Sequence, residues 1–122
     1  MDILQNDGNT SISYFKSQVK EFVTNRNWSK YHSPKNLIQA LGIEVSELSE
    51  LFLFKDINSN DILKNSKLLE AVTGEIADIF IYLISLTNSL NIDLTSSFVK
   101  KMKINKEKYP PEEFNDGTYY KK

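Results

Sequence analysis

The chain has 122 residues, of which 40% are hydrophobic and 25% charged, a composition typical of one soluble globular domain rather than a disordered chain. Its 15 basic residues oppose 16 acidic ones, so the net charge of -1 gives no pull towards nucleic acid polymers or anionic membranes. The absence of cysteine and the single histidine exclude disulfide scaffolds, thiolate metal sites, cysteine nucleophiles and histidine-rich metal sites.

The first half of the chain predicts two helices. Residues 1–10 are polar and expected to be flexible; no basic stretch precedes an apolar one there, so no secretory signal is visible and the cytoplasm is the expected location. Residues 11–26 space apolar side chains three and four apart, which predicts an amphipathic helix with a face of Ile12, Phe15, Val19, Phe22 and Val23. Ser33 before Pro34 is a typical helix start, and a second helix is expected over residues 34–54.

The second half predicts two more helices. Residues 55–65 are mostly polar and are interpreted as a connection, and a third helix is expected over residues 66–90. Its apolar run is too short to span a bilayer, so no membrane association is expected. Asp93 can cap a fourth helix over residues 94–108, with Pro110 and Pro111 ending it and a core face of Leu94, Phe98 and Met102. Residues 112–122 form a tail without a pattern.

No segment shows sustained period-two alternation, so the predicted fold class is all-α, a four-helix bundle in one domain over residues 11–111. The third helix is apolar on more faces than one four-helix core can cover, because its apolar residues include Ile76, Ile79, Phe80, Leu83, Ile84 and Leu86. Large exposed apolar patches usually mark association surfaces. We therefore expect a homo-oligomer, either a dimer or a tetramer.

Carboxylates interrupt the apolar spacing of the second and third helices. The second helix has a core-facing row of Leu37, Leu41, Glu44, Leu48 and Leu51, so Glu44 takes a core position and Glu47 lies one turn on, at the edge. In the third helix, Glu75 and Asp78 share a stripe beside the apolar row of Val72, Ile76, Ile79, Leu83, Leu86 and Leu90. Two acidic pairs at spacing three therefore occupy or border core positions.

Buried carboxylates without cationic partners are costly, and like charges raise each other's pKa. Neither stripe contains an Arg or Lys that could neutralise the four acids. A divalent cation would solve the problem, and oxygen ligands without Cys or His indicate Mg²⁺ or Mn²⁺ rather than Zn²⁺. The alternative is that Glu44 and Glu47 face solvent on an ordinary amphipathic helix; Asp78 is harder to explain that way, because its neighbours leave no obvious polar face.

The two acidic pairs also resemble the pattern of a known protein family. The pairs Glu44-x-x-Glu47 and Glu75-x-x-Asp78 resemble the signature of the MazG-like nucleotide pyrophosphohydrolases, part of the all-α nucleoside triphosphate pyrophosphatase superfamily. The surrounding segments RNWSKYHSPKNL, ELSELF, EIADIFIYL and KMKINKEKYP look like the deoxycytidine triphosphate pyrophosphatase branch. The resemblance covers roughly residues 12–111, nearly the whole predicted domain.

The resemblance implies hydrolysis of a nucleoside triphosphate to the monophosphate and pyrophosphate, with dCTP-like substrates among those expected, as house-cleaning of the nucleotide pool. It implies that Glu44, Glu47, Glu75 and Asp78 bind Mg²⁺, with Glu47 the candidate general base. The positions that fall on the substrate-binding side of the family are Trp28, His32, Lys35, Asn36, Phe54, Tyr82, Lys101, Asn105 and Tyr109. Members of the family assemble as dimers or dimers of dimers.

Two departures concern the base pocket. Deoxycytidine-selective relatives carry a tryptophan where this chain has Phe54, and a histidine near the position of Val19. Each substrate-side residue also has a structural alternative: Trp28 could cap the bundle, His32 could hold the helix entry, and the lysines of the fourth helix could be solvated. A non-catalytic dimerisation or adaptor module with vestigial carboxylates is the alternative for the whole chain. A pyrophosphohydrolase acting on phosphoribosyl-ATP is a third hypothesis, which the segments around Trp28 and Lys101 disfavour.

Overall fold

The structure is a computed structural model, and it describes residues 4–122. The described residues form helices and turns without a β-strand, so the predicted all-α class is confirmed. The chain divides into two compact units, the first ending at Asn91 and the second beginning at Ile92, so the domain expected over residues 11–111 spans this boundary. Part of the expected flexible N-terminus, residues 1–3, lies outside the described residues; residues 4–10 contain a turn in which Asn6 and Asn9 bond each other.

The first two helices begin at side-chain caps. Helix α1 spans Ile12–Asn25, and the Ser11 hydroxyl accepts a hydrogen bond from the Tyr14 amide. A short 3-10 turn, η1, spans Ser29–Tyr31 and leads into α2, Pro34–Glu50. The Ser33 hydroxyl accepts from the Asn36 amide at 3.2 Å, so the cap expected from the Ser-Pro pair is confirmed.

Helix α2 is shorter than expected. It ends at Glu50, and three successive turn hydrogen bonds carry the chain to Phe54, which has a positive φ of 59° and turns the backbone away from the helix axis. The polar segment interpreted as a connection contains a helix that the sequence analysis missed, α3, Ser59–Lys64. Its start is a reciprocal capping box between Asn58 and Asp61.

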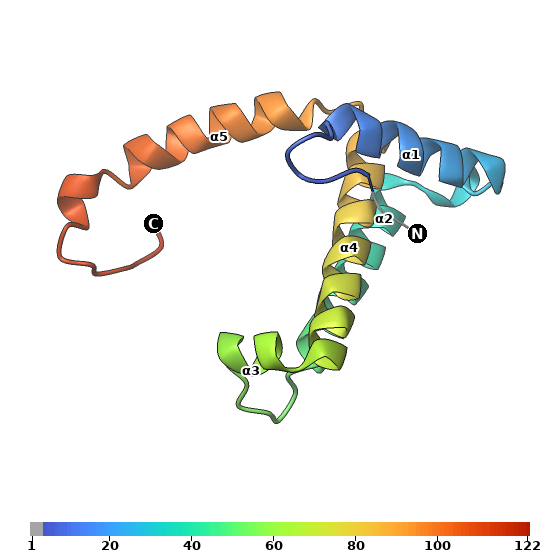
Figure 1. The fold of residues 1–122 in the computed structure, drawn as a ribbon. Helices are drawn as coiled ribbons and strands as arrows, with labels where there is room; N and C mark the ends of the chain where they lie inside the picture. Colours follow the sequence, from blue (N-terminus) through green and yellow to red (C-terminus); the bar gives the residue numbers. More distant parts are fainter. Residues whose placement is uncertain (1–3) are drawn as a thin grey trace. The chain divides into compact units, whose positions relative to one another are not determined.

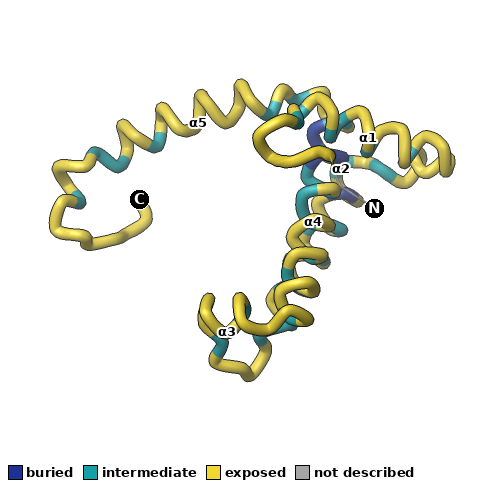
Figure 2. Tube along the Cα trace, in the orientation of Figure 1, coloured by how far each residue is buried: buried dark blue, intermediate teal, exposed yellow. Residues whose placement is uncertain are grey.

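Helix α4, Ser66–Ser89, is the centre of the first unit and packs against α2, α1 and α3 (Figure 1). Its longest contact is with α2, which runs antiparallel to it. The buried residues of the described chain gather where the start of α2 meets the C-terminal half of α4, namely Leu37, Ile84, Ser85 and Thr87 (Figure 2). The apolar row predicted for the third helix is correct except at Ile76 and Leu90, which are about half exposed, at 53% and 49%.

The second unit contains α5, Leu94–Lys108, and a 3-10 turn η2, Pro111–Glu113. The predicted cap is confirmed, since the Asp93 carboxylate accepts from the Ser96 amide at 2.8 Å. The predicted core face of this helix is wrong within the unit: Phe98 is 63% exposed and Met102 38%. The spacing of four between Leu94, Phe98 and Met102 indicates which face is apolar but not what covers it.

The tail packs on the end of α5. The Tyr109 hydroxyl accepts from the Lys122 amide at 2.7 Å, and Phe114 lies between the Tyr109 and Tyr120 rings. The tail predicted to lack a pattern therefore has a small aromatic cluster of its own. Across both units, none of the described helices is long and apolar enough to cross a membrane.

Candidate active site

Three of the four predicted carboxylates converge between α2 and α4. One oxygen from each of Glu44, Glu75 and Asp78 lies within 4.8 Å of the others. Glu44 takes the core position predicted for it on α2, and Glu75 takes the facing position on α4, where the exposed Ile76 had been expected. The antiparallel helices thus bring together Glu44 from the predicted core row of α2 and two acids, Glu75 and Asp78, from the stripe beside the apolar row of α4.

Two of the cluster's oxygens are buried without a hydrogen-bond partner, Oε2 of Glu44 and Oε2 of Glu75. Burial is the main cause that raises the pKa of Glu44 to about 7, followed by its hydrogen bond with Glu47 and the charges nearby. No Lys or Arg of residues 4–122 forms an ion pair with these acids. A hard divalent cation satisfies such oxygens, and carboxylate oxygens are the protein ligands that Mg²⁺ takes, so the residues fit this ion.

Glu47 lies at the edge of the cluster. It is exposed on α2, one turn after Glu44, and it is a hydrogen-bonding and electrostatic neighbour of that carboxylate. Its oxygens fall outside the group of three that converge. An acid that borders a metal site while remaining open to water can accept a proton from that water.

A cavity of about 600 Å³ lies beside the carboxylates, between α1 and α4. Glu44 and Asp78 border it, and its other walls are mainly aromatic and aliphatic, formed by Phe15, Gln18, Val19, Phe22, Val23, Trp28, His32, Phe80, Ile81, Tyr82 and Ser85. Phe22 and Trp28 meet edge to face with ring centroids 5.7 Å apart, and Phe15 and Phe80 do so at 5.2 Å. An apolar cavity with acids at its border suits a flat ring attached to a metal-bound anion.

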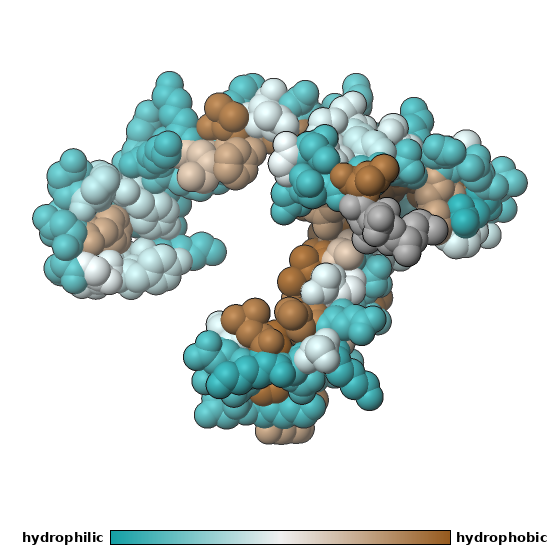
Figure 3. All heavy atoms as spheres, viewed as in Figure 1, coloured by the Kyte–Doolittle hydropathy of each residue, from teal (hydrophilic) through white to brown (hydrophobic). Residues whose placement is uncertain are grey.

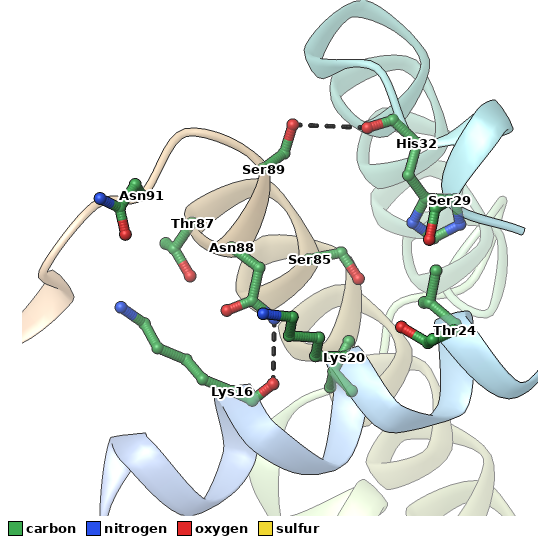
Figure 4. A pocket seen from close by; sticks show the side chains of 12 residues that line it. Lys16, Lys20, Thr24, Ser29, His32, Ser85, Thr87, Asn88, Ser89 and Asn91 are labelled. Atoms are coloured by element: carbon green, nitrogen blue, oxygen red, sulfur yellow. Dashed lines mark hydrogen bonds between the residues drawn. The ribbon is translucent and has the colours of Figure 1, made fainter.

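A second, polar cavity of about 390 Å³ adjoins the first (Figure 4). The two share Val19, Val23, His32 and Ser85, and the second is otherwise lined mostly by hydroxyl, amide and lysine side chains. Two hydrogen bonds tie its walls: Asn88 Nδ2 donates to the Lys16 carbonyl oxygen at 3.0 Å, and Ser89 Oγ donates to the His32 carbonyl oxygen at 3.4 Å. The C-terminal half of α4 is thereby held against α1 and the entry to α2.

The structure brings three predicted substrate-side residues to the aromatic cavity, Trp28, His32 and Tyr82. Lys35 is exposed on α2 and lines neither cavity, and the Asn36 side-chain amide donates to the Tyr31 carbonyl oxygen at 2.9 Å, which ties η1 to the start of α2. Phe54 is 99% exposed and lines neither of these two cavities.

Three further predicted residues belong to the second unit. Lys101 is exposed on α5, Asn105 is half-buried one turn later, and Tyr109 ends the helix with its hydroxyl bonded to the tail. The spacing of four places them along one side of α5, as predicted.

The sequence analysis did not assign Gln18 or Ser85 to the site. It placed Phe15 and Phe22 on the apolar face of the first helix and counted Phe80 among the apolar residues that one four-helix core cannot cover. Apolar periodicity indicates that a face points inwards, but it cannot separate a packed core from the wall of a cavity. The available signal was the polar side chain of Gln18 between Phe15 and Phe22 on that face.

Comparisons with known proteins point to one family. The model of the MazG-like family matches residues 40–121. The dCTP pyrophosphatase 1 of Rattus norvegicus and that of Homo sapiens are each 37% identical over 91 residues, which cover 74% of this chain and 54% of the relative. The chain thus spans about half the length of the curated relatives that it matches.

A solved structure gives the same result at the level of the fold. A pyrophosphatase from Archaeoglobus fulgidus superposes with a TM-score of 0.74 at 32% identity, covering 89% of this chain and 99% of the archaeal one. The match to the family model includes all four predicted carboxylates and all of α4 and α5. The chain therefore belongs to the MazG-like family.

Proposed function

We propose that the chain is a divalent-metal-dependent nucleoside triphosphate pyrophosphohydrolase, which cleaves the bond between the α- and β-phosphates and releases pyrophosphate. The observation that carries the proposal is the convergence of Glu44, Glu75 and Asp78 at the border of an aromatic cavity. The printed activities of the relatives, a dCTP pyrophosphatase and a pyrophosphatase, support it. Mg²⁺ is the ion proposed, because all the ligands are carboxylate oxygens.

The roles of the chain's own residues follow from their places. When bound, Mg²⁺ would supply positive charge that offsets the triphosphate and polarises its phosphorus. Glu44, Glu75 and Asp78 would hold the ion, which would give the unpartnered oxygens of Glu44 and Glu75 a partner. Glu47, exposed at the edge, would accept the proton of the attacking water.

The aromatic cavity would hold the nucleoside. Trp28 offers an indole face to a nucleobase, and stacking on a base contributes about 1–3 kcal/mol. Tyr82 lies one helical turn after Asp78, so it is placed near the sugar when the triphosphate lies at the carboxylates. We propose deoxynucleoside triphosphates as substrates, with pyrimidines such as dCTP first, and house-cleaning of the nucleotide pool as the role.

The alternative function is a non-catalytic helical adaptor whose carboxylates are vestigial. The unpartnered buried oxygens of Glu44 and Glu75 disfavour it, because an adaptor gains nothing from keeping two costly buried acids. An assay of pyrophosphate release separates the two functions. The enzyme requires release from at least one deoxynucleoside triphosphate that depends on added Mg²⁺ and stops with chelator, whereas the adaptor releases none.

We also propose that the working unit is a homo-oligomer. Helix α2 exposes Ile38 and Val45 one heptad apart, and α4 exposes Leu69 and Ile76 with the same spacing. Apolar residues gather along the visible face of α4 and α3 (Figure 3). The second unit independently exposes Phe98 on α5. Apolar surface of this extent is covered in stable proteins, and a second copy of the chain offers matching surface.

A further inference from the structure

We propose that Gln18 and Ser85 hydrogen-bond the edge of the substrate's base, and that the pocket consequently accepts cytosine and thymine or uracil with similar efficiency. The inference rests on the proposed function, since it assigns base-reading residues within the aromatic cavity. It concerns two polar side chains that reach the cavity from opposite walls, one on α1 and one on α4.

Gln18 is the polar exception among the residues of α1 that line the aromatic cavity. The other residues of that helix that line the aromatic cavity are all apolar, namely Phe15, Val19, Phe22 and Val23. Gln18 is exposed, and none of the hydrogen bonds between described residues uses its side-chain amide, so the amide can bind a ligand without breaking a bond within the protein. A ligand with a polar edge would provide partners that the cavity walls lack.

Ser85 supplies the second polar group from the facing wall. It is 5% exposed and lines both cavities, and in Figure 4 its hydroxyl points from α4 into the space beside α1. It lies seven residues after Asp78, which is about 10 Å along a helix at 1.5 Å per residue. That separation matches the length of a nucleoside, so a base would reach Ser85 when its phosphates lie at the carboxylates.

The hydrogen-bonding groups of the glutamine amide explain why the pocket is expected to accept more than one pyrimidine base. A glutamine presents one acceptor and two donors side by side, and it can rotate by a half turn without changing its shape. In one orientation it accepts from the amino group of cytosine and donates to the ring nitrogen. In the other it donates to the carbonyl of thymine or uracil and accepts from the ring N–H. A serine hydroxyl likewise both donates and accepts, so neither group selects between these bases.

The inference is tested by combining a change in the residue with a change in the substrate. The wild-type chain and Gln18→Leu are compared on dTTP, on dCTP and on the triphosphate of difluorotoluene deoxynucleoside, which has the shape of thymine with almost no hydrogen-bonding edge. We expect Gln18→Leu to lower kcat/KM about 10-fold for dTTP and dCTP, with little change for the analogue. Gln39→Leu, an exposed glutamine of α2 outside both cavities, is the matched control and should change none of the three.

Calorimetric binding of α,β-methylene analogues of dCTP and dTTP keeps this test separate from the test of catalysis. Binding that weakens in Gln18→Leu supports base reading even when no pyrophosphate is released, and that pattern would overturn only the proposed reaction. Equal losses for dTTP and its difluorotoluene analogue would overturn base reading by Gln18. A wild-type preference above about 100-fold between dCTP and dTTP would overturn the tolerance of the pocket.

Discussion

Glu44 and Glu75 occupy core positions of facing helices, where leucine or isoleucine would otherwise pack, and each keeps one buried oxygen without a partner. Such groups lower the stability of the metal-free protein, because the desolvation of a carboxylate is not repaid by a hydrogen bond or an ion pair. A stability cost of this kind is common where the same residues serve a ligand. The cluster is therefore best understood as a site that a divalent cation completes.

The first prediction concerns the ligands of that cation. Glu44→Gln, Glu75→Gln and Asp78→Asn should each lower turnover at least ~100-fold, because each removes a charged ligand. The melting temperature of the metal-free protein should stay level or rise, since an amide carries no clustered charge. Steady-state assays and thermal melts in chelator measure both effects. Glu50→Gln, an exposed glutamate at the end of α2, is the control; wild-type rates in two of the three ligand variants would refute the assignment.

The second prediction concerns pH. The pKa of Glu44 rises from 4.5 to about 7 in the folded, metal-free chain, so between these values the folded state keeps a proton that the unfolded state has lost. The free energy of unfolding of the metal-free protein should therefore fall as pH rises from about 4.5 to about 7. Above about pH 7, Glu44 should cause little further change in that free energy. Denaturant melts at several pH values should show this slope in the wild type. Glu44→Gln should remove most of it, and an unchanged slope in that variant would contradict the assignment.

Metal binding should have the opposite pH dependence. The ion requires the ionised carboxylate and so competes with the proton held by Glu44. The apparent affinity for Mg²⁺ should increase as pH rises to about 7 and then level off. Titrations of Mg²⁺ in buffers between pH 5.5 and 8.5 would measure it, and an affinity independent of pH across that range would argue that Glu44 does not hold the ion.

At the scale of elements, the pairing of α2 with α4 determines the site. The sequence predicted both helices and their apolar rows, because three-four spacing reports the inward face directly. It also predicted the caps Ser33 and Asp93, which depend only on local hydrogen bonds. It missed α3, because a six-residue helix has too little apolar spacing to detect and is set by the Asn58–Asp61 capping box and by packing on α4.

The candidate site was predictable to a similar degree. The carboxylates were found because they interrupt apolar rows, and the structure brings three of them together. The aromatic cavity was not found, because Phe15 and Phe22 have the same spacing whether they pack in a core or line a pocket. The exposure of Phe54 could not be predicted either, since it depends on where α2 ends and on the left-handed turn that follows.

The third prediction tests the entry to α2. Ser33→Ala removes the hydroxyl that accepts from the Asn36 amide, and the loss of such a cap costs about 1 kcal/mol of stability. Ser46→Ala, in the middle of the same helix, removes only a hydroxyl that donates to the Gly42 carbonyl oxygen, so its effect should be near zero. Urea unfolding of the two variants side by side would measure the difference; equal stabilities would show that the cap contributes nothing.

At the scale of the whole molecule, neither unit buries all of its large apolar side chains. Ile38 on α2 and Ile76 on α4 are more than half exposed, and so is Phe98 on α5. The fully exposed Phe54 belongs to the same set. Because these apolar side chains are exposed, we expect copies of the chain to associate. The residues that bind one substrate can then come from different copies.

The fourth prediction concerns that association. Light scattering should report a particle of at least two chains, and Ile76→Glu should lower its mass by placing a charge in the covered face. A monomer of 14.1 kDa with full activity at micromolar concentration would refute the oligomer. Lys67→Glu, an exposed position at the start of α4, is the control for added charge on the same helix.

The fifth prediction asks whether one site draws on two chains. Asp78→Asn and Lys101→Ala chains, each nearly inactive alone, should regain activity when mixed and refolded, if Lys101 serves the carboxylates of another copy. Mixed assemblies with one differently tagged subunit of each kind would be purified and assayed. Activity no greater than the mean of the parents would place Lys101 and Asp78 of each site within a single chain.

One measurement tests the central claim most directly, the release of pyrophosphate from a panel of deoxynucleoside triphosphates by the purified chain, with Mg²⁺ and with chelator. The claim predicts stoichiometric monophosphate and pyrophosphate from at least one pyrimidine triphosphate, only with the metal, and a loss of at least ~100-fold in Asp78→Asn. Release of orthophosphate instead of pyrophosphate, or equal rates with chelator, or no turnover of any member of the panel, would contradict it.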